Sequence, residues 1–261
     1  MKSFKHDDLH YFRFDSLPSN GVATHAVFSR RGGVSPAPFD SLNMSMSVPD
    51  TRECVYANRR RVYGLFGHDT DTVVHAHLVH GADVARVTPA NNGTWVEHFD
   101  GLITNQPGTV LGMNFADCAP IFLYDPRRRA IGLGHAGWRG TVVDLPGAMV
   151  RAMVEQFGSD PVDLVAAVGP CIGPCCYEVG DEVIDAVSVA FAEPEKLLRQ
   201  NGGPRPHFDL PEANIRNLKA AGVRAIELSD YCTACRTDLF FSHRAEKGRT
   251  GRFGAVFALG D

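Results

Sequence analysis

The sequence predicts a mixed α+β fold, with strands and helices interleaved irregularly in one domain that spans residues 1–261. Short apolar runs bounded by Gly, Pro, Asn or Asp recur along the chain and are typical of β-strands. Amphipathic stretches with helical periodicity separate some of these runs. Their order does not follow the strict strand–helix alternation of a fully parallel sheet. The chain shows no low-complexity linker and no internal repeat.

The apolar runs define the expected strands, and about five helices are expected between them. The strands are predicted over residues 26–28, 72–77, 84–87, 101–104, 110–114, 121–124, 130–134, 164–168, 225–228 and 253–258. Helices are predicted over residues 142–157, 181–191 and 211–221, and Arg59 is expected to lie on another helix. The apolar positions in these segments recur with the period of an α-helix.

The charge and the apolar content exclude several classes of partner. The formal net charge of −4 argues against nucleic-acid or anionic-membrane binding, because both select basic surfaces. No apolar run approaches the ~20 residues that a membrane span needs. The first 15 residues lack the apolar core of a signal peptide, so a cytoplasmic protein is expected.

The segment Gly134-His135-Ala136-Gly137-Trp138-Arg139-Gly140 concentrates chemically useful side chains. An apolar run precedes it and an amphipathic segment follows it, which predicts a strand, a sharp turn at His135 and a helix. Such a turn presents free backbone N–H groups at the helix N-terminus, where anions bind. The alternative is a tight turn that carries a buried Trp and a surface Arg.

Two further segments place a possible metal ligand where an apolar strand breaks. His80 precedes Gly81, and Cys118 follows Asp117. Together with His135, these residues come from three separate elements and leave a fourth coordination position open, which is typical of catalytic zinc. The thiolate of Cys118 favours zinc or copper(I) over magnesium or calcium. Taken one at a time, each residue is also compatible with an ordinary buried His or Cys.

The three segments and several other blocks resemble the hallmarks of the YfiH-like family of laccase-domain, or polyphenol-oxidoreductase-like, proteins. The resemblance implies two mixed sheets packed together with helices outside, and a zinc ion held by His80, Cys118 and His135. The chain departs from the family pattern at Ser47, Leu78 and His243, where His, Gln and Tyr are usual, which affects substrate details. The matching blocks lie at residues 29–35, 38–43, 58–59, 79–81, 116–118, 135–140, 169–174, 232–233, 240–242 and 250–252.

Side chains around this predicted centre suit a nucleoside and phosphate. The guanidinium groups of Arg30, Arg59 and Arg139 are candidates for binding phosphate, since the planar fork of Arg matches phosphate oxygens. Trp138 offers a face for stacking a flat ring. Asn43 can both donate to and accept from a base edge or a ribose. Each arginine alone is also compatible with a solvated surface charge.

Phosphorolysis and deamination both need a group that moves a proton. The candidates are Asp100, Asp117 and Glu178. Asp117 adjoins Cys118, but neighbouring side chains in a strand point to opposite faces, so we expect Asp117 to support the site rather than to act in it. Asp100 is preferred as the catalytic acid, because it begins a strand near the metal segments and matches an Asp of the family.

The family's reported activities imply a zinc-dependent purine nucleoside phosphorylase acting on adenosine, inosine, guanosine or methylthioadenosine, with adenosine deaminase activity. One alternative is an amide or ester hydrolase with Cys118 as nucleophile and His135 as base, for which the resemblance suggests editing of cell-wall precursors. A second is a copper-dependent polyphenol oxidase, although the only HxH is His75-Ala76-His77 and no His-Cys-His is present. A third is a metal-stabilised binding module. The chain lacks the H-x-E…P-C-x-x-C signature of nucleobase deaminases.

The remaining cysteines suggest a second possible metal site. Seven cysteines without a secretion signal do not predict a disulfide framework. Cys232 and Cys235 form a C-x-x-C motif, which could bind a structural zinc ion together with Cys171 or Cys175. Loosely placed thiols are the alternative, and the family resemblance does not require Cys at positions 171, 175 or 176.

Overall fold

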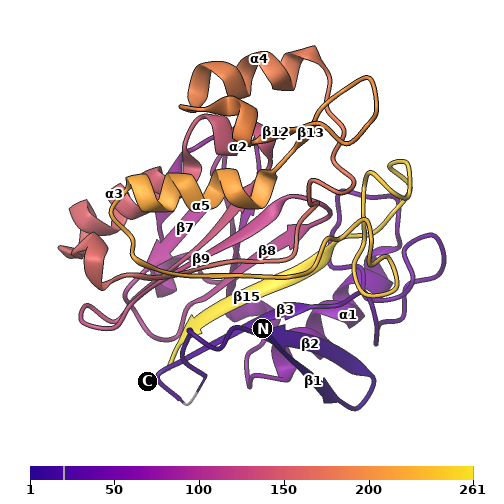
Figure 1. Cartoon of the computed structure of the whole chain (residues 1–261). Coiled ribbons are helices and arrows are strands. Elements are labelled where there is room, and N and C mark those ends of the chain that lie inside the picture. Colours follow the sequence, from indigo (N-terminus) through magenta and orange to yellow (C-terminus); the bar gives the residue numbers. More distant parts are fainter. Residues whose placement is uncertain (20, 261) are drawn as a thin grey trace.

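The computed structural model describes residues 1–19 and 21–260, and most of its strands lie in two mixed sheets (Figure 1). The larger sheet has seven strands in spatial order: β1 (Lys2–His6), β2 (Leu9–Arg13), β3 (Ala23–Phe28), β15 (Phe253–Leu259), β8 (Val110–Phe115), β4 (Val73–His77) and β6 (Trp95–Glu97). Neighbours are antiparallel from β1 to β8, whereas β4 runs parallel to both β8 and β6.

The second sheet has six strands and carries most of the residues that position the site. Its spatial order is β14 (Ala225–Leu228), β11 (Val165–Val168), β9 (Ala119–Asp125), β10 (Ala130–Ala136), β7 (Gly101–Thr104) and β5 (Val84–Arg86). The two edge pairs, β14 with β11 and β7 with β5, are parallel, and the central pairs are antiparallel. A small hairpin-like pair, β12 (Leu198–Arg199) and β13 (His207–Phe208), stands apart from both sheets.

The helices are α1 (Arg52–Gly64), α2 (Trp138–Val142), α3 (Leu145–Phe157), α4 (Asp181–Ala190) and α5 (Leu210–Ala220). Short 3₁₀ turns lie at Thr70–Thr72, Pro89–Asn91, Pro161–Asp163 and Pro194–Lys196. The helix predicted over residues 142–157 is in fact two helices. Asp144 breaks it with a left-handed backbone (φ 63°) and caps α3 by accepting a hydrogen bond from the Gly147 N–H.

The two sheets pack face to face, and helices cover their outer faces. Alternate residues of β9 show this arrangement: Phe122 faces the core between the sheets, whereas Ile121 and Leu123 face the core under α3 and α5. On the other side, α1 contributes Val62 and Tyr63 to a core against the larger sheet. Figure 1 shows α3 and α5 lying across the strands of the smaller sheet. The α/β/β/α layering expected from the family resemblance is confirmed.

Every strand predicted from the sequence is present, with ends that differ by up to a few residues. The strands that the sequence did not predict are β1, β2, β6, β12 and β13, which are short or rich in polar residues. None of the described helices is both long and apolar enough to cross a lipid bilayer.

Candidate metal centre and its cavity

The three predicted metal ligands converge in the structure. His80 lies in the loop after β4, Cys118 lies between β8 and β9, and His135 lies in β10, opposite Pro120 of β9. Their ligand atoms all lie within 4.8 Å of one another. His135 is therefore a strand residue, and the predicted turn at this position was wrong by two residues: the chain turns at Gly137, the N-cap of α2.

A buried carboxylate holds two of the three ligand segments. Asp100 Oδ2 accepts hydrogen bonds from the backbone N–H groups of Val79 (3.1 Å) and Gly81 (2.8 Å), which flank His80. Asp100 Oδ1 lies 3.3 Å from His135 Nδ1. With Nδ1 directed at a carboxylate, His135 keeps Nε2 for a metal, an arrangement typical of metal-binding histidines.

The placement of Asp100 does not fit the role of proton donor that the sequence suggested. Its side chain is fully buried, it is not part of the cavity wall, and both of its oxygens already have partners. Burial alone would raise the pKa of this carboxyl, but the hydrogen bonds from His135 and from the Gly81 N–H outweigh burial and lower the pKa. Asp100 is thus an ionised acceptor behind the ligands.

Cys118 and His135 form a strongly interacting pair. Burial raises the pKa of the Cys118 thiol, but the charge of His135 and hydrogen bonds from His135 and His80 lower it to about 6. Burial likewise lowers the pKa of His135, but the Cys118 thiolate and Asp100 raise it to about 9. The favoured state is therefore a thiolate beside an imidazolium, and the thiolate is the form that binds a metal.

Gly137 leaves space beside the ligands. A Cβ atom at this position would lie 2.9 Å from Cys118 Sγ and 3.2 Å from His80 Nδ1. The backbone there (φ −75°, ψ 177°) is one that any residue adopts. Glycine is thus required at this position for the space next to the sulfur and nitrogen, rather than for the backbone conformation.

The ligand group opens into a cavity of about 1020 Å³. Three residues predicted to bind substrate lie on its wall: Arg59, Trp138 and Arg139. The Arg139 guanidinium lies over the Trp138 ring at 4.2 Å from the centroid and also pairs with Glu182. The positions that depart from the family pattern, Ser47, Leu78 and His243, all line the same cavity.

Arg59 has an unpaired nitrogen at the cavity. The residue lies on α1 and is 5 % exposed, and its Nε donates to the Met44 carbonyl at 3.0 Å. Its guanidinium also lies over the ring of Trp95. Within the described part of the chain, Nη2 is buried and has no hydrogen-bond partner. A buried donor without an acceptor is costly, so a small shift that brings Nη2 to an anion in the cavity would give it a partner.

Arg30 and Asn43 do not reach the cavity, in contrast to the sequence-based prediction. Arg30 donates to the carbonyls of Asp40 and Thr237 and forms an ion pair with Glu246 at 2.8 Å. Asn43 is fully buried, donates to the Ser45 carbonyl and accepts from backbone N–H groups. Both side chains hold loops together, because their polar atoms are used by protein partners.

Asp117 lines the cavity next to Cys118, in a bend between β8 and β9, so its expected supporting role stays a prediction. Its carboxylate accepts hydrogen bonds from the Thr233 hydroxyl (2.6 Å) and the Arg244 N–H (2.7 Å). Asp117 and His80 both have a left-handed backbone (φ 82° and 61°), a strained conformation that is common at functional sites. Glu178 is not on the cavity wall.

Several cavity residues were not singled out from the sequence: Tyr56, Trp95, Tyr177, Arg244 and Arg252. Arg252 lies in one of the matching blocks and could have been found there, whereas the others had no comparable signal. His75 also lines the cavity, where it stacks on Trp95 at 4.6 Å, and His77 contacts Glu97. Among the described residues, neither His75 nor His77 belongs to a possible metal-ligand group.

Comparison with known proteins places this architecture in a family. The family model described as multi-copper polyphenol oxidoreductase laccase matches residues 24–260. The chain belongs to this family. It is 38% identical over 259 residues to purine nucleoside phosphorylase YlmD of Geobacillus stearothermophilus, which covers 95% of this chain and 94% of that protein. It is also 38% identical over 240 residues to a purine nucleoside phosphorylase of Deinococcus radiodurans, covering 92% and 90%.

A solved structure supports the same relationship. The crystal structure of YlmD from Geobacillus stearothermophilus superimposes with a TM-score of 0.92 at 36% identity, covering 99% of this chain and 98% of that chain. The laccase-domain resemblance inferred from the sequence blocks is thus confirmed for nearly the whole chain.

Proposed function

We propose that this protein is a zinc-dependent purine nucleoside phosphorylase. The observation that carries the proposal is a cavity whose wall holds the three-ligand group, aromatic side chains and the unpaired nitrogen of Arg59. The names of relatives that match over nearly their whole length support the same activity. The proposed substrates are adenosine, inosine, guanosine or methylthioadenosine together with phosphate, and deamination of adenosine is a proposed second reaction.

His80, Cys118 and His135 would hold the zinc ion. Two imidazoles and a thiolate are a donor set that zinc prefers, and the gap beside Gly137 leaves room for it. When bound, zinc polarises an oxygen ligand and lowers the pKa of a coordinated water. The same donor set can bind copper(I), which we consider the less favoured metal for this site.

Arg59 is the proposed phosphate-binding residue, in place of Arg30. Phosphorolysis replaces the glycosidic C–N bond by a C–O bond to phosphate, so the phosphate oxygens must be held beside the sugar. Arg59 lines the cavity, its buried Nη2 has no protein partner, and its guanidinium lies over Trp95, so a small shift would let it donate to phosphate. Trp138, which also lines the cavity, is the proposed stacking face for the purine.

Asp100 is proposed to be a positioning residue rather than a catalytic one. Asp100 fixes the tautomer of His135 and the position of the loop that carries His80. Its substitution would therefore lower turnover by disturbing the metal ligands rather than by removing a proton donor.

The experiment that tests the proposal incubates the purified protein with adenosine in the presence and absence of phosphate. We expect adenine and ribose 1-phosphate only when phosphate is present, and inosine from deamination whether or not phosphate is present. Inosine, guanosine and methylthioadenosine are tested in parallel, and the Cys118→Ala variant serves as the inactive control. A zinc-loaded protein that converts none of the four nucleosides would overturn the proposal.

One observation favours a second candidate function. The lowered pKa of Cys118, about 6, and its contact with His135 are also what a cysteine nucleophile requires. In that case alkylation of Cys118 in metal-free protein would abolish ester or amide hydrolysis, and a chelator would leave hydrolysis intact. Loss of the activity on chelation would exclude this candidate.

A further inference from the structure

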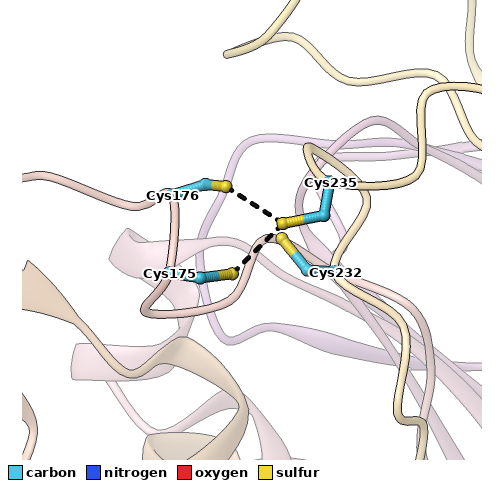
Figure 2. A group of neighbouring side chains, drawn as sticks. All are labelled: Cys175, Cys176, Cys232 and Cys235. Atoms are coloured by element: carbon cyan, nitrogen blue, oxygen red, sulfur yellow. Dashed lines mark hydrogen bonds between the residues drawn. The ribbon is translucent and has the colours of Figure 1, made fainter.

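Four cysteines from two loops meet at the surface, outside the wall of the cavity. Cys175 and Cys176 lie in the loop after β11, and Cys232 and Cys235 lie in the loop after β14. Figure 2 shows the four side chains pointing toward one another from these two loops. All four sulfurs lie within 4.8 Å of one another.

The sheet explains why the loops meet. Strands β11 and β14 are parallel neighbours, so their carboxyl ends lie at the same edge of the sheet. Backbone pairing continues beyond both strands, because Cys171 and Cys232 form a parallel bridge and the Thr233 N–H donates to the Cys171 carbonyl at 3.0 Å. Cys171 takes part only through its backbone: its thiol is buried and is not a member of the four-cysteine group.

The distances between the sulfurs suit a tetrahedral metal site. Cys235 Sγ lies 3.4 Å from Cys175 Sγ and 3.3 Å from Cys176 Sγ. A tetrahedron with Zn–S bonds of about 2.3 Å has edges of about 3.8 Å, so small shifts of the side chains would place all four sulfurs around one ion. Cys235 Sγ is almost equally distant from two of the other sulfurs, which suits a shared metal ion better than one disulfide pair.

The surroundings also favour metal binding over packing. Cys175 and Cys235 are exposed, whereas Cys176 and Cys232 are half-buried and pack against the core under α3 and α5, so the group lies at the edge of that core. The Gly173 N–H donates to Cys232 Sγ at 3.2 Å, and a backbone donor of this kind stabilises a thiolate. The Arg236 N–H donates to the Cys232 carbonyl at 3.0 Å, which curls the C-x-x-C segment into a turn.

We infer that Cys175, Cys176, Cys232 and Cys235 form a second, structural zinc site. Four thiolates fill the tetrahedron and leave no position for water or substrate, so the site would join the two loops rather than carry out chemistry. It is separate from the three-ligand group and does not depend on the activity proposed for the cavity.

The second site would also steady the cavity. Thr233 adjoins Cys232 and donates its hydroxyl at 2.6 Å to Asp117, the residue that precedes Cys118. The other loop supplies Ile172 and Tyr177 to the cavity wall. A metal that ties the two loops would therefore fix both the partner of Asp117 and two residues of the cavity wall.

Zinc content measured by mass spectrometry on protein purified with reductant tests the inference. We expect about two zinc ions per chain in the native protein, about one in Cys235→Ser and about one in Cys118→Ala. Cys54→Ser is the matched control, since Cys54 belongs to neither group, and it should retain about two. A native content of about one ion that disappears in Cys118→Ala would overturn the inference.

A spectroscopic measurement keeps the inference testable if Cys235→Ser does not fold. Cobalt bound to the Cys118→Ala variant should show the strong sulfur-to-cobalt absorption and the visible bands of a tetrahedral tetrathiolate. Absence of these bands in a folded variant would contradict the inference. So would a disulfide among the four cysteines, detected in protein purified without reductant as cysteines that are alkylated only after reduction.

Discussion

The two groups of metal-ligating side chains differ in the number of ligands and in their surroundings. His80, Cys118 and His135 come from three elements and border a cavity of about 1020 Å³, with a buried carboxylate behind His135. The four-cysteine group comes from two surface loops and lies outside the wall of that cavity. Three ligands beside a cavity leave a coordination position for substrate, whereas four thiolates close the sphere. A zinc ion would thus have a catalytic role at the cavity group and a structural role at the four-cysteine group, where it would hold two loops together.

Gly137→Ala should give the largest effect and should act on the cavity group alone. The added Cβ would lie 2.9 Å from Cys118 Sγ and so would occupy the space beside the ligands. We expect loss of the cavity zinc and a loss of about a thousandfold or more in turnover, because a bound metal contributes several kcal/mol to the transition state. Total zinc should fall by about one ion per chain while the circular dichroism spectrum is unchanged.

Gly81→Ala is the matched control for this prediction. Its added Cβ would make only ordinary contacts, 3.6 Å from Val79 and 3.9 Å from Asp100. We expect zinc content and turnover close to those of the native protein. Full zinc content and turnover in Gly137→Ala would show that the space beside the ligands is not where the metal binds.

Asp100→Asn should weaken zinc binding at the cavity group by about 10–100-fold, the usual effect of removing a hydrogen-bond partner of a ligand. An amide oxygen can still accept from His135, but the amide nitrogen would then face the Val79 and Gly81 N–H groups. Zinc affinity measured by competition with a chelator tests this. Asp125→Asn is the control, because Asp125 is also a buried acceptor of two backbone N–H groups but lies outside the cavity wall.

The result for Asp100→Asn separates positioning from proton donation. If Asp100 positions His135, excess zinc should restore part of the turnover. Turnover that stays absent at saturating zinc would instead support the role of general acid.

Arg59→Gln should leave both metal groups loaded and should raise the KM for phosphate. Loss of a charge-assisted hydrogen bond costs ~1.5–3 kcal/mol, which corresponds to about 10–100-fold in KM. Steady-state kinetics with varied phosphate measure the effect. Arg30→Gln is the comparison: it should lower the melting temperature, since it breaks the ion pair with Glu246, without a similar rise in KM. The reverse pattern would restore Arg30 as the phosphate residue.

The sequence predicted the sheets well because buried strands require apolar runs that end at turn-forming residues. It named three candidate ligands that the structure brings together, because each stands at or near the end of such a run. It misplaced Arg30, because an arginine in a Gly-rich loop suggests an anion-binding site. The actual partner of that arginine is Glu246, more than 200 residues later in the chain, and no local sequence pattern shows this pairing. It named Cys171 or Cys175 as a possible partner of the C-x-x-C motif, and the structure brings Cys175 and Cys176 to the motif but not the Cys171 thiol. The choice between Cys171 and Cys176 depends on which way each side chain points from its loop, and spacing alone does not define that direction.

Thr233→Val should give the smallest effect and tests whether the two groups are linked. Valine keeps the shape of threonine but removes the hydroxyl that donates to Asp117 at 2.6 Å. A hydrogen bond to a charged group is worth ~1.5–3 kcal/mol, and only part of it passes through Asp117 to Cys118, so we expect zinc affinity at the cavity group to fall by about tenfold or less. Thr104→Val is the control, since Thr104 is equally buried but lies in β7, away from both groups.

Loss of the four-cysteine zinc tests the same link from the other end, because Thr233 adjoins Cys232. In the native protein, this loss should lower the zinc affinity of the cavity group by a similar factor. In Thr233→Val, the same loss should cause little further decrease in that affinity. If removal of the four-cysteine zinc instead lowers the zinc affinity of the cavity group equally in the native protein and in Thr233→Val, the two groups act independently.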